Sequence, residues 1–132
     1  MGQPGTAAFS GKYLSVTSLR RDGAGVSTPV WFVSEGGRLL IETDGDSYKV
    51  KRIRANPSVT VASCTVRGRL NGESFPARAE VLPVADVARV EQLLAHKYRI
   101  DMLGMKPIRW AQAKLHLGRK RGVSVIVAIT PE

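Results

Sequence analysis

The sequence is poor in the residues that build metal centres and disulfide frameworks. Its one cysteine, Cys64, cannot form an intramolecular disulfide, and its two histidines, His96 and His116, lie too far apart for a metal-binding motif. No apolar run approaches the length that crosses a bilayer, and the N-terminus lacks the apolar core of a signal peptide. We therefore expect a cytoplasmic protein without a metal site.

Acidic residues are also scarce. Lys and Arg together number 20 against 11 Asp and Glu, which gives a formal net charge of +9. This excess predicts an acidic partner, such as nucleic acid, a phosphate ligand or a polycarboxylate, and charge alone does not choose among them. With 43% apolar residues the chain has enough for a core. We expect one domain over 1–132, in which 1–12 form an N-terminal arm.

The motifs of protein-based catalysis are missing as well. No Ser/His/Asp grouping and no glycine-rich phosphate loop of the Walker or Rossmann type is present. Cys64 ends an expected strand and has no paired histidine that would make it a nucleophile. The catalytic residues are therefore unknown at this stage, and an enzyme built on this sequence needs a cofactor for its chemistry.

Hydrophobic patterning predicts mainly β-structure with inserted helices. Strands are expected over 13–19, 26–34, 38–43, 58–64, 74–82 and 123–130, and helices over 47–55, 87–98 and 107–118. Turns at 21–25 and 35–37 join the first three strands into an antiparallel meander. Because hairpins dominate and the last strand is distant from the others, we predict a six-stranded antiparallel closed or split β-barrel.

The expected helix 47–55 is the strongest candidate for a binding site. It carries four cations, Lys49, Lys51, Arg52 and Arg54. Lys49 and Arg52 share one helix face, and Lys51 and Arg54 share another. The hydroxyls of Thr43 and Ser47 flank the helix start, where free backbone N–H groups favour an anion.

A plainer interpretation of this helix is a solvated basic surface. In that case Asp44 and Asp46 would satisfy the first N–H groups of the helix as ordinary caps. The basic runs 67–69 and 119–121 allow the same two interpretations, either as solvated loops or as extensions of an anion groove.

The expected strand 26–34 offers a surface for a flat ring. Trp31 and Phe32 are neighbours, so they face opposite sides of the strand. One of them packs in the core, and the other is available to line a pocket. Pro29 predicts an edge or an interrupted ladder, which leaves N–H and C=O groups for a ligand's heterocycle.

These motifs together resemble a known family. The matching pattern is Asp22-Gly23, Thr28-Pro29-Val30-Trp31-Phe32, Gly37-Arg38-Leu39, Thr43, the run from Ser47 to Ile53, Asn56-Pro57-Ser58-Val59, and Cys64 followed by Arg67-Gly68-Arg69. It resembles the flavin/deazaflavin oxidoreductases related to pyridoxamine 5′-phosphate oxidase, in particular the small actinobacterial B-type group that uses coenzyme F420. The resemblance covers nearly all of the chain up to Leu82.

The resemblance implies a split β-barrel homodimer with its cofactor at the subunit interface. In the family the ring lies against the strand that matches Pro29 to Trp31, and the phosphate is held by residues around Thr43 and the helix start. The implied cofactor-binding residues are Pro29, Val30, Trp31, Thr43, Ser47, Lys49, Lys51, Arg52 and Ile53.

The family uses either F420 or FMN, and the charge of +9 favours F420 with its acidic tail. The implied reaction is hydride transfer from reduced F420 to an electron-poor small molecule, such as an enone, a quinone or a tetrapyrrole. The alternatives are an FMN-dependent oxidoreductase and a non-catalytic F420 or flavin carrier. A nucleic-acid-binding domain ranks last because clustered exposed aromatics and a known binding motif are missing. No membrane partner is expected.

Overall fold

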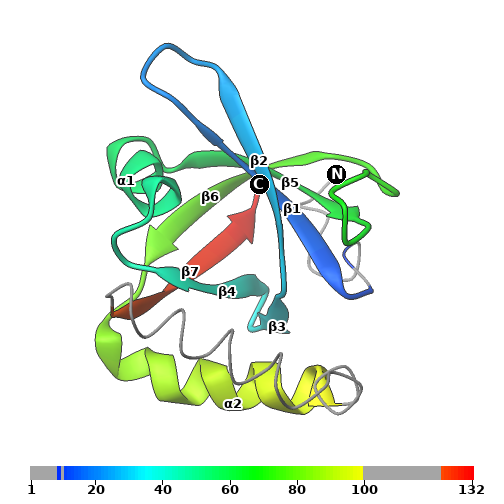
Figure 1. The fold of residues 1–132 in the computed structure, drawn as a ribbon, viewed down its shortest axis with the longest axis vertical. Helices are drawn as coiled ribbons and strands as arrows, with labels where there is room; N and C mark the ends of the chain where they lie inside the picture. The colour runs from blue at the N-terminus through cyan, green and yellow to red at the C-terminus, as the bar shows by residue number, and fades with distance from the viewer. Residues whose placement is uncertain (1–8, 10, 100–122) are drawn as a thin grey trace.

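The computed structural model describes residues 9, 11–99 and 123–132 (Figure 1). The expected helix 107–118 and the basic run 119–121 lie outside these residues. Within them the strands form one antiparallel sheet in the order β2-β1-β5-β6-β7-β4-β3. The strands are β1 (Tyr13–Leu19), β2 (Gly25–Val30), β3 (Val33–Glu35), β4 (Arg38–Asp44), β5 (Ser58–Cys64), β6 (Phe75–Val81) and β7 (Ser124–Pro131).

The expected strand 26–34 is two strands, so the sheet has seven strands where six were predicted. β2 pairs with β1, whereas β3 pairs with β4. These two sequence neighbours therefore stand at opposite ends of the sheet, and the chain passes from one end to the other through Trp31 and Phe32. This passage curls the sheet into a barrel, which confirms the predicted split-barrel class.

The barrel has a split on one side of this passage. β3 pairs only with residues 38–40, so the rest of β4, from Ile41 to Asp44, has β7 as its one strand partner among the described strands. Among the described strands, β2 pairs only with β1. Two strand edges therefore diverge from Phe32 without pairing. Pro29 lies on one of them, as expected for a residue that has no N–H to donate to a ladder.

The barrel interior is apolar and closely filled. Alternate residues of each strand point inward, which buries Leu14 and Val16 of β1 against the inner faces of β4, β5, β6 and β7. Phe9 is only 4% exposed, and its ring meets that of Phe75 edge-on at 5.4 Å. The chain therefore enters the core inside the segment that was expected to be an arm.

A helix covers the outer face of the barrel below β4 and β7 (Figure 1). It is α2 (Val87–Lys97), which follows the 3₁₀ turn η2 (Val84–Asp86). Val90 and Leu94 pack with residues of β4 and β7, so β7 is buried on both faces and its run from Val125 to Ile129 is continuously apolar. None of the helices that the structure describes is long and apolar enough to span a membrane.

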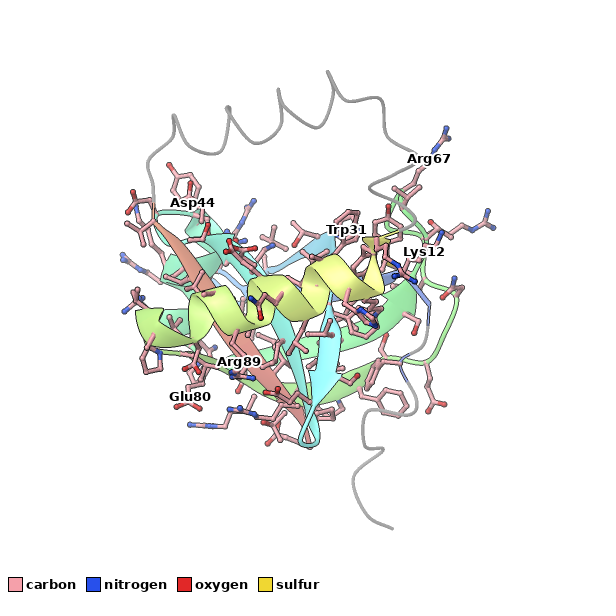
Figure 2. All side chains as sticks on the ribbon, turned by 90° about the horizontal axis from the view of Figure 1, so that it is seen from below. Lys12, Trp31, Asp44, Arg67, Glu80 and Arg89 are labelled. Atoms are coloured by element: carbon pink, nitrogen blue, oxygen red, sulfur yellow. The ribbon has the colours of Figure 1, made fainter. Side chains whose placement is uncertain are left out.

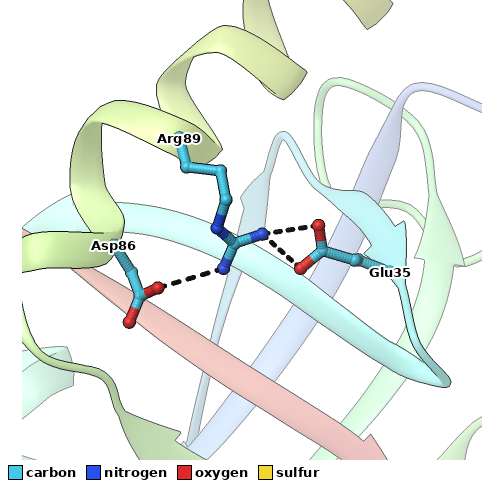
Figure 3. A network of polar contacts seen from close by, with 3 residues as sticks. All are labelled: Glu35, Asp86 and Arg89. Carbon is cyan, nitrogen blue, oxygen red and sulfur yellow. Dashed lines mark hydrogen bonds and ion pairs between the residues drawn. The ribbon is translucent and has the colours of Figure 1, made fainter.

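A three-residue network ties the N-terminal part of α2 to the sheet (Figure 3). The Arg89 guanidinium forms an ion pair with Glu35 of β3 and bonds Asp86 at 3.1 Å. All three side chains are partly exposed to water, so the network orients the helix more than it stabilises the fold.

Candidate functional site

The helix that carries the predicted cations follows the unpaired end of β4. It is α1 (Tyr48–Ala55), which is separated from β4 by three residues, connects β4 to β5, and packs against β1 and β6. Val50 and Ile53 are its buried residues. The turn that enters α1 requires glycine at position 45. The Gly45 N–H donates to the Val123 carbonyl oxygen at 2.9 Å, and a Cβ on this residue would lie only 2.9 Å from the same oxygen.

The acids before α1 do not cap it. The Asp44 carboxylate accepts the N–H of Asp46 at 2.9 Å, and the Ser47 hydroxyl accepts the N–H of Val50 at 3.2 Å. The first turn contains no acid, and among the described residues the N–H groups of Tyr48 and Lys49 have no acceptor. Asp44 and Asp46 were expected as caps in the plainer interpretation and do not have this role, so the start of the helix keeps its positive potential.

Lys49 and Arg52 form a half-buried pair of like charges. Burial lowers the pKa of Lys49, and repulsion by Arg52 lowers it further. Arg52 donates its Nε–H to the Ser18 hydroxyl at 2.7 Å, and Ser18 is 0% exposed on the inner face of β1. Within the described part of the chain, neither cation forms an ion pair with a carboxylate. Desolvated charges without a counter-charge are costly, so this pair is suited to bind an anion.

A second group without a partner lies on the opposite edge of the split. The Thr28 hydroxyl oxygen is buried and has no hydrogen-bond partner in the part of the chain that the structure describes. Thr28 faces Val16 across β1–β2, on the inner side of the edge strand. A buried unpaired hydroxyl costs about 1–3 kcal/mol. In the sequence analysis Thr28 was named only within a motif and not as a candidate site residue. Its alternation with Val30 on the strand was the signal that could have placed it on the inner side.

The predicted phosphate-binding residues are only partly brought together. Lys49, Arg52 and the Ser47 cap share the first turns of α1, and Thr43 lies near the end of β4 just before them. Thr43 alternates with buried Leu39 and Ile41 and therefore faces inward.

Two other predicted residues of α1 point elsewhere. Lys51 is exposed, with its Nζ 5.3 Å from the centroid of the Tyr48 ring, on a different face from Lys49. Ile53 is 2% exposed and packs in the barrel core.

The strand expected to hold a ring has its aromatic residues on opposite sides, as predicted. Phe32 is buried in the barrel interior, and Val30 packs against the same cluster. Trp31 lies on the outside, stacked on Tyr98 with ring centroids 4.2 Å apart and planes at 3°. Pro29 is exposed. Its ring lies beside Gly68, where a Cβ would be in van der Waals contact with it at 3.8 Å.

The break was expected at Pro29, but it lies at Trp31 and Phe32, and the backbone groups of Phe32 are not free. The Phe32 N–H donates to the Tyr98 hydroxyl at 3.1 Å. Lys97 donates from Nζ to the Phe32 carbonyl at 2.7 Å. Both partners lie at the end of α2, and no local sequence signal pointed to Lys97.

A groove lies on the other flank of α1. It has a volume of about 840 Å³ and contains one predicted residue, Ile53. Arg54 and Arg78 line it together with acidic and apolar residues of β6 and β7. Because it holds none of the unpartnered groups, we assign the site to the flank of Lys49 and Arg52. Burial raises the pKa of Cys64, so its thiol is no ready nucleophile.

Comparison with known families gives one match that spans most of the chain. Residues 8–130 match the family model described as pyridoxamine 5′-phosphate oxidase. No curated protein matches the sequence.

Solved structures share the fold at low sequence identity. A conserved hypothetical protein, Rv2991 from Mycobacterium tuberculosis, is 21% identical with a TM-score of 0.65, over 93% of this chain and 74% of its own. An F420 reductase is 17% identical with a TM-score of 0.62, and the match covers 100% of this chain and 96% of the reductase. HutZ, the heme storage protein from Vibrio cholerae, is 14% identical with a TM-score of 0.58, and the match covers 92% of this chain and 82% of HutZ.

Proposed function

Since the chain belongs to the pyridoxamine 5′-phosphate oxidase family, we propose that it is a cytoplasmic oxidoreductase that uses a bound flavin-type cofactor, coenzyme F420. Its proposed reaction is the transfer of a hydride from reduced F420 to an electron-poor small molecule, such as an enone, a quinone or a tetrapyrrole. The similarity to an F420 reductase over the full length of this chain supports the choice of cofactor.

One observation carries the proposal. Lys49 and Arg52 are held side by side, partly out of water, and the pKa of Lys49 is lowered by burial and by repulsion from Arg52. A protein that only needed a soluble surface would leave both side chains in water. A phosphate group there would accept charge-assisted hydrogen bonds and remove the repulsion.

The residues of the split fit the rest of such a cofactor. In the bound state we assign the phosphate to Lys49, Arg52, Thr43 and the first N–H groups of α1, and the ring to the strand Pro29–Trp31. We further assign to a polar atom of the ring the Thr28 hydroxyl on β2, which lacks a partner among the described residues. The contribution of the chain is to bind, orient and desolvate the cofactor, and the bound cofactor supplies the hydride chemistry.

FMN is the alternative cofactor, and a non-catalytic carrier is the alternative role. FMN also has a phosphate, so the Lys49–Arg52 pair alone does not separate the two cofactors. The net charge of +9 favours F420, whose acidic tail adds carboxylates. The fold similarity to a heme storage protein is the reason to keep the carrier role under test.

Titration of the purified protein with F420 and FMN at increasing salt concentrations tests the choice of cofactor. We expect F420 to bind more tightly than FMN at physiological ionic strength, and its affinity to fall more steeply with salt because more charges are screened. Tighter binding of FMN under those conditions would replace F420 by FMN in the proposal.

A further inference from the structure

The break between β2 and β3 is held by side chains from a distant element. The hydroxyl of Tyr98 accepts the N–H of Phe32 at 3.1 Å and lies 2.7 Å from the Lys12 carbonyl oxygen, to which it donates. Tyr98 is 0% exposed, and its ring carries the stacked indole of Trp31. One residue at the end of α2 thus fixes the backbone of Phe32 and the side chain of Trp31.

Lys97 completes this contact from the same end of the helix. Its Nζ donates to the Phe32 carbonyl at 2.7 Å and lies 3.5 Å from the centroid of the Phe32 ring. The same nitrogen is 5.0 Å from the centroid of the Tyr98 ring. Although the side chain as a whole is exposed, its ammonium group lies against two aromatic rings and a carbonyl oxygen and is therefore partly withdrawn from water.

Figure 2 shows where this arrangement lies relative to the split. Trp31 and Lys12 are at the C-terminal end of α2, whereas Asp44, at the end of β4, lies at the opposite end of the helix. The contact therefore acts at the apex from which the β2 and β4 edges diverge. The anion-binding pair on α1 belongs to the other end of the same split.

We propose that Lys97 is a positioning residue for the cofactor ring: together with Tyr98 it holds the Phe32 peptide and so sets the orientation of Pro29, Val30 and Trp31. The inference rests on the proposed function, because these three residues are the expected ring-binding strand. Lys97 acts through the backbone and through the Trp31–Tyr98 stack. Protonated Lys97 holds the carbonyl as a charge-assisted donor, and the neutral amine holds it less strongly.

Among the described residues, the ionisable neighbours of Lys97 include no acid that would keep it charged. His96 on α2 and Arg99 just after α2 flank the pair, and Lys12 meets it through its main-chain carbonyl. On the strand beside α2, Glu35 is paired with Arg89. Desolvation is the cause that lowers the pKa of Lys97, to about 8. The Lys97 amine in this contact therefore changes its protonation state close to physiological pH.

Two readouts test the proposal, and only one of them needs a cofactor. In a Trp110→Phe background, Trp31 is the remaining tryptophan of the two in the chain. We expect its fluorescence in the free protein to change with a midpoint near pH 8, the pKa of Lys97. Lys97→Met should lose this transition. Arg89→Met, which frees the other end of α2 from β3, is the matched control and should keep it.

The second readout is the dissociation constant of F420 between pH 7 and 9.5, a range in which the phosphate charge is constant. We expect wild-type affinity to fall across pH 8, Lys97→Met to bind about tenfold more weakly at pH 7 without that inflection, and Lys97→Arg to keep the wild-type affinity at pH 7 but lose the inflection at pH 8. A free protein without the fluorescence transition, or Lys97→Met with the wild-type affinity and pH profile, overturns the proposal. If wild-type protein binds neither F420 nor FMN, the proposed function fails while the fluorescence still tests the contact.

Discussion

At the scale of single residues, the site consists of groups that lack their natural partner. Lys49 is desolvated beside a like charge, and among the described residues the buried Thr28 hydroxyl has no hydrogen-bond partner. Arg52 donates its Nε–H to Ser18, which orients its guanidinium group. The charge repulsion and the unpaired hydroxyl cost free energy in the free protein, and in our proposal the bound cofactor relieves both. Such costs concentrate at binding sites, where function and stability compete.

Lys49→Met should separate binding from stability. We expect F420 affinity to drop by about 1.5–3 kcal/mol, the range of a lost hydrogen bond to a charged group. The unfolding temperature should stay equal or rise, because the substitution removes a desolvated cation that Arg52 repels. Arg54→Met, on the groove side of α1, is the control and should leave affinity nearly unchanged. Equal loss in both variants would show that α1 acts only as a basic surface.

Thr28→Val tests the unpaired hydroxyl with little change of shape. The two side chains are both β-branched, so the strand is preserved while the hydroxyl is removed. We expect the free protein to gain about 1 kcal/mol of stability and the cofactor to bind more weakly. Thr60→Val, at an exposed position of β5, serves as the reference. Denaturant unfolding and cofactor titration measure both effects, and a destabilised Thr28→Val would contradict the assignment.

At the scale of elements, the sequence predicted what is locally determined. α1 and α2 were predicted to within a residue, because Ser47 caps one and the apolar spacing Val87, Val90, Leu94 defines the other. The break at Trp31–Phe32 was missed, since the alternation runs on through 26–34. It is made by Tyr98 and Lys97, which replace strand partners for Phe32. A tertiary contact between residues so far apart in sequence leaves no local signal.

The α2 contact predicts a pH dependence of stability. The pKa of Lys97 is lowered from 10.5 to about 8 in the folded protein by desolvation. Between those values the unfolded chain binds more protons than the folded one, so this group makes stability rise as pH increases from 8 toward 10.5. Unfolding in urea at pH 7 and 9.5 should show this rise in wild type and a smaller one in Lys97→Met. Parallel curves for the two proteins would mean that Lys97 is fully hydrated.

At the scale of the whole molecule, the fold is a barrel with one open side. β2 and the end of β4 present unpaired edges among the described strands, and such edges are normally covered. We propose that a twofold copy of the chain covers these edges and completes two equivalent sites, as the family resemblance implies.

We accordingly predict a C2 homodimer. Light scattering at micromolar concentration should give twice the chain mass of 14.3 kDa. F420 should stabilise the dimer if the cofactor lies at the interface, because a ligand that binds only the assembled form shifts the equilibrium toward it. A monomer that binds F420 with full affinity would move the site away from the interface.

The most direct test of the account is the oxidation of reduced F420 by a panel of enones, quinones and tetrapyrroles in the presence of the protein. We predict turnover with at least one acceptor, and its loss in Lys49→Met under conditions where that variant no longer binds F420. Oxygen alone should oxidise the reduced cofactor poorly. Tight F420 binding with no turnover across the panel would contradict a reductase and favour a carrier, and fast oxygen consumption with FMN would point to an oxidase.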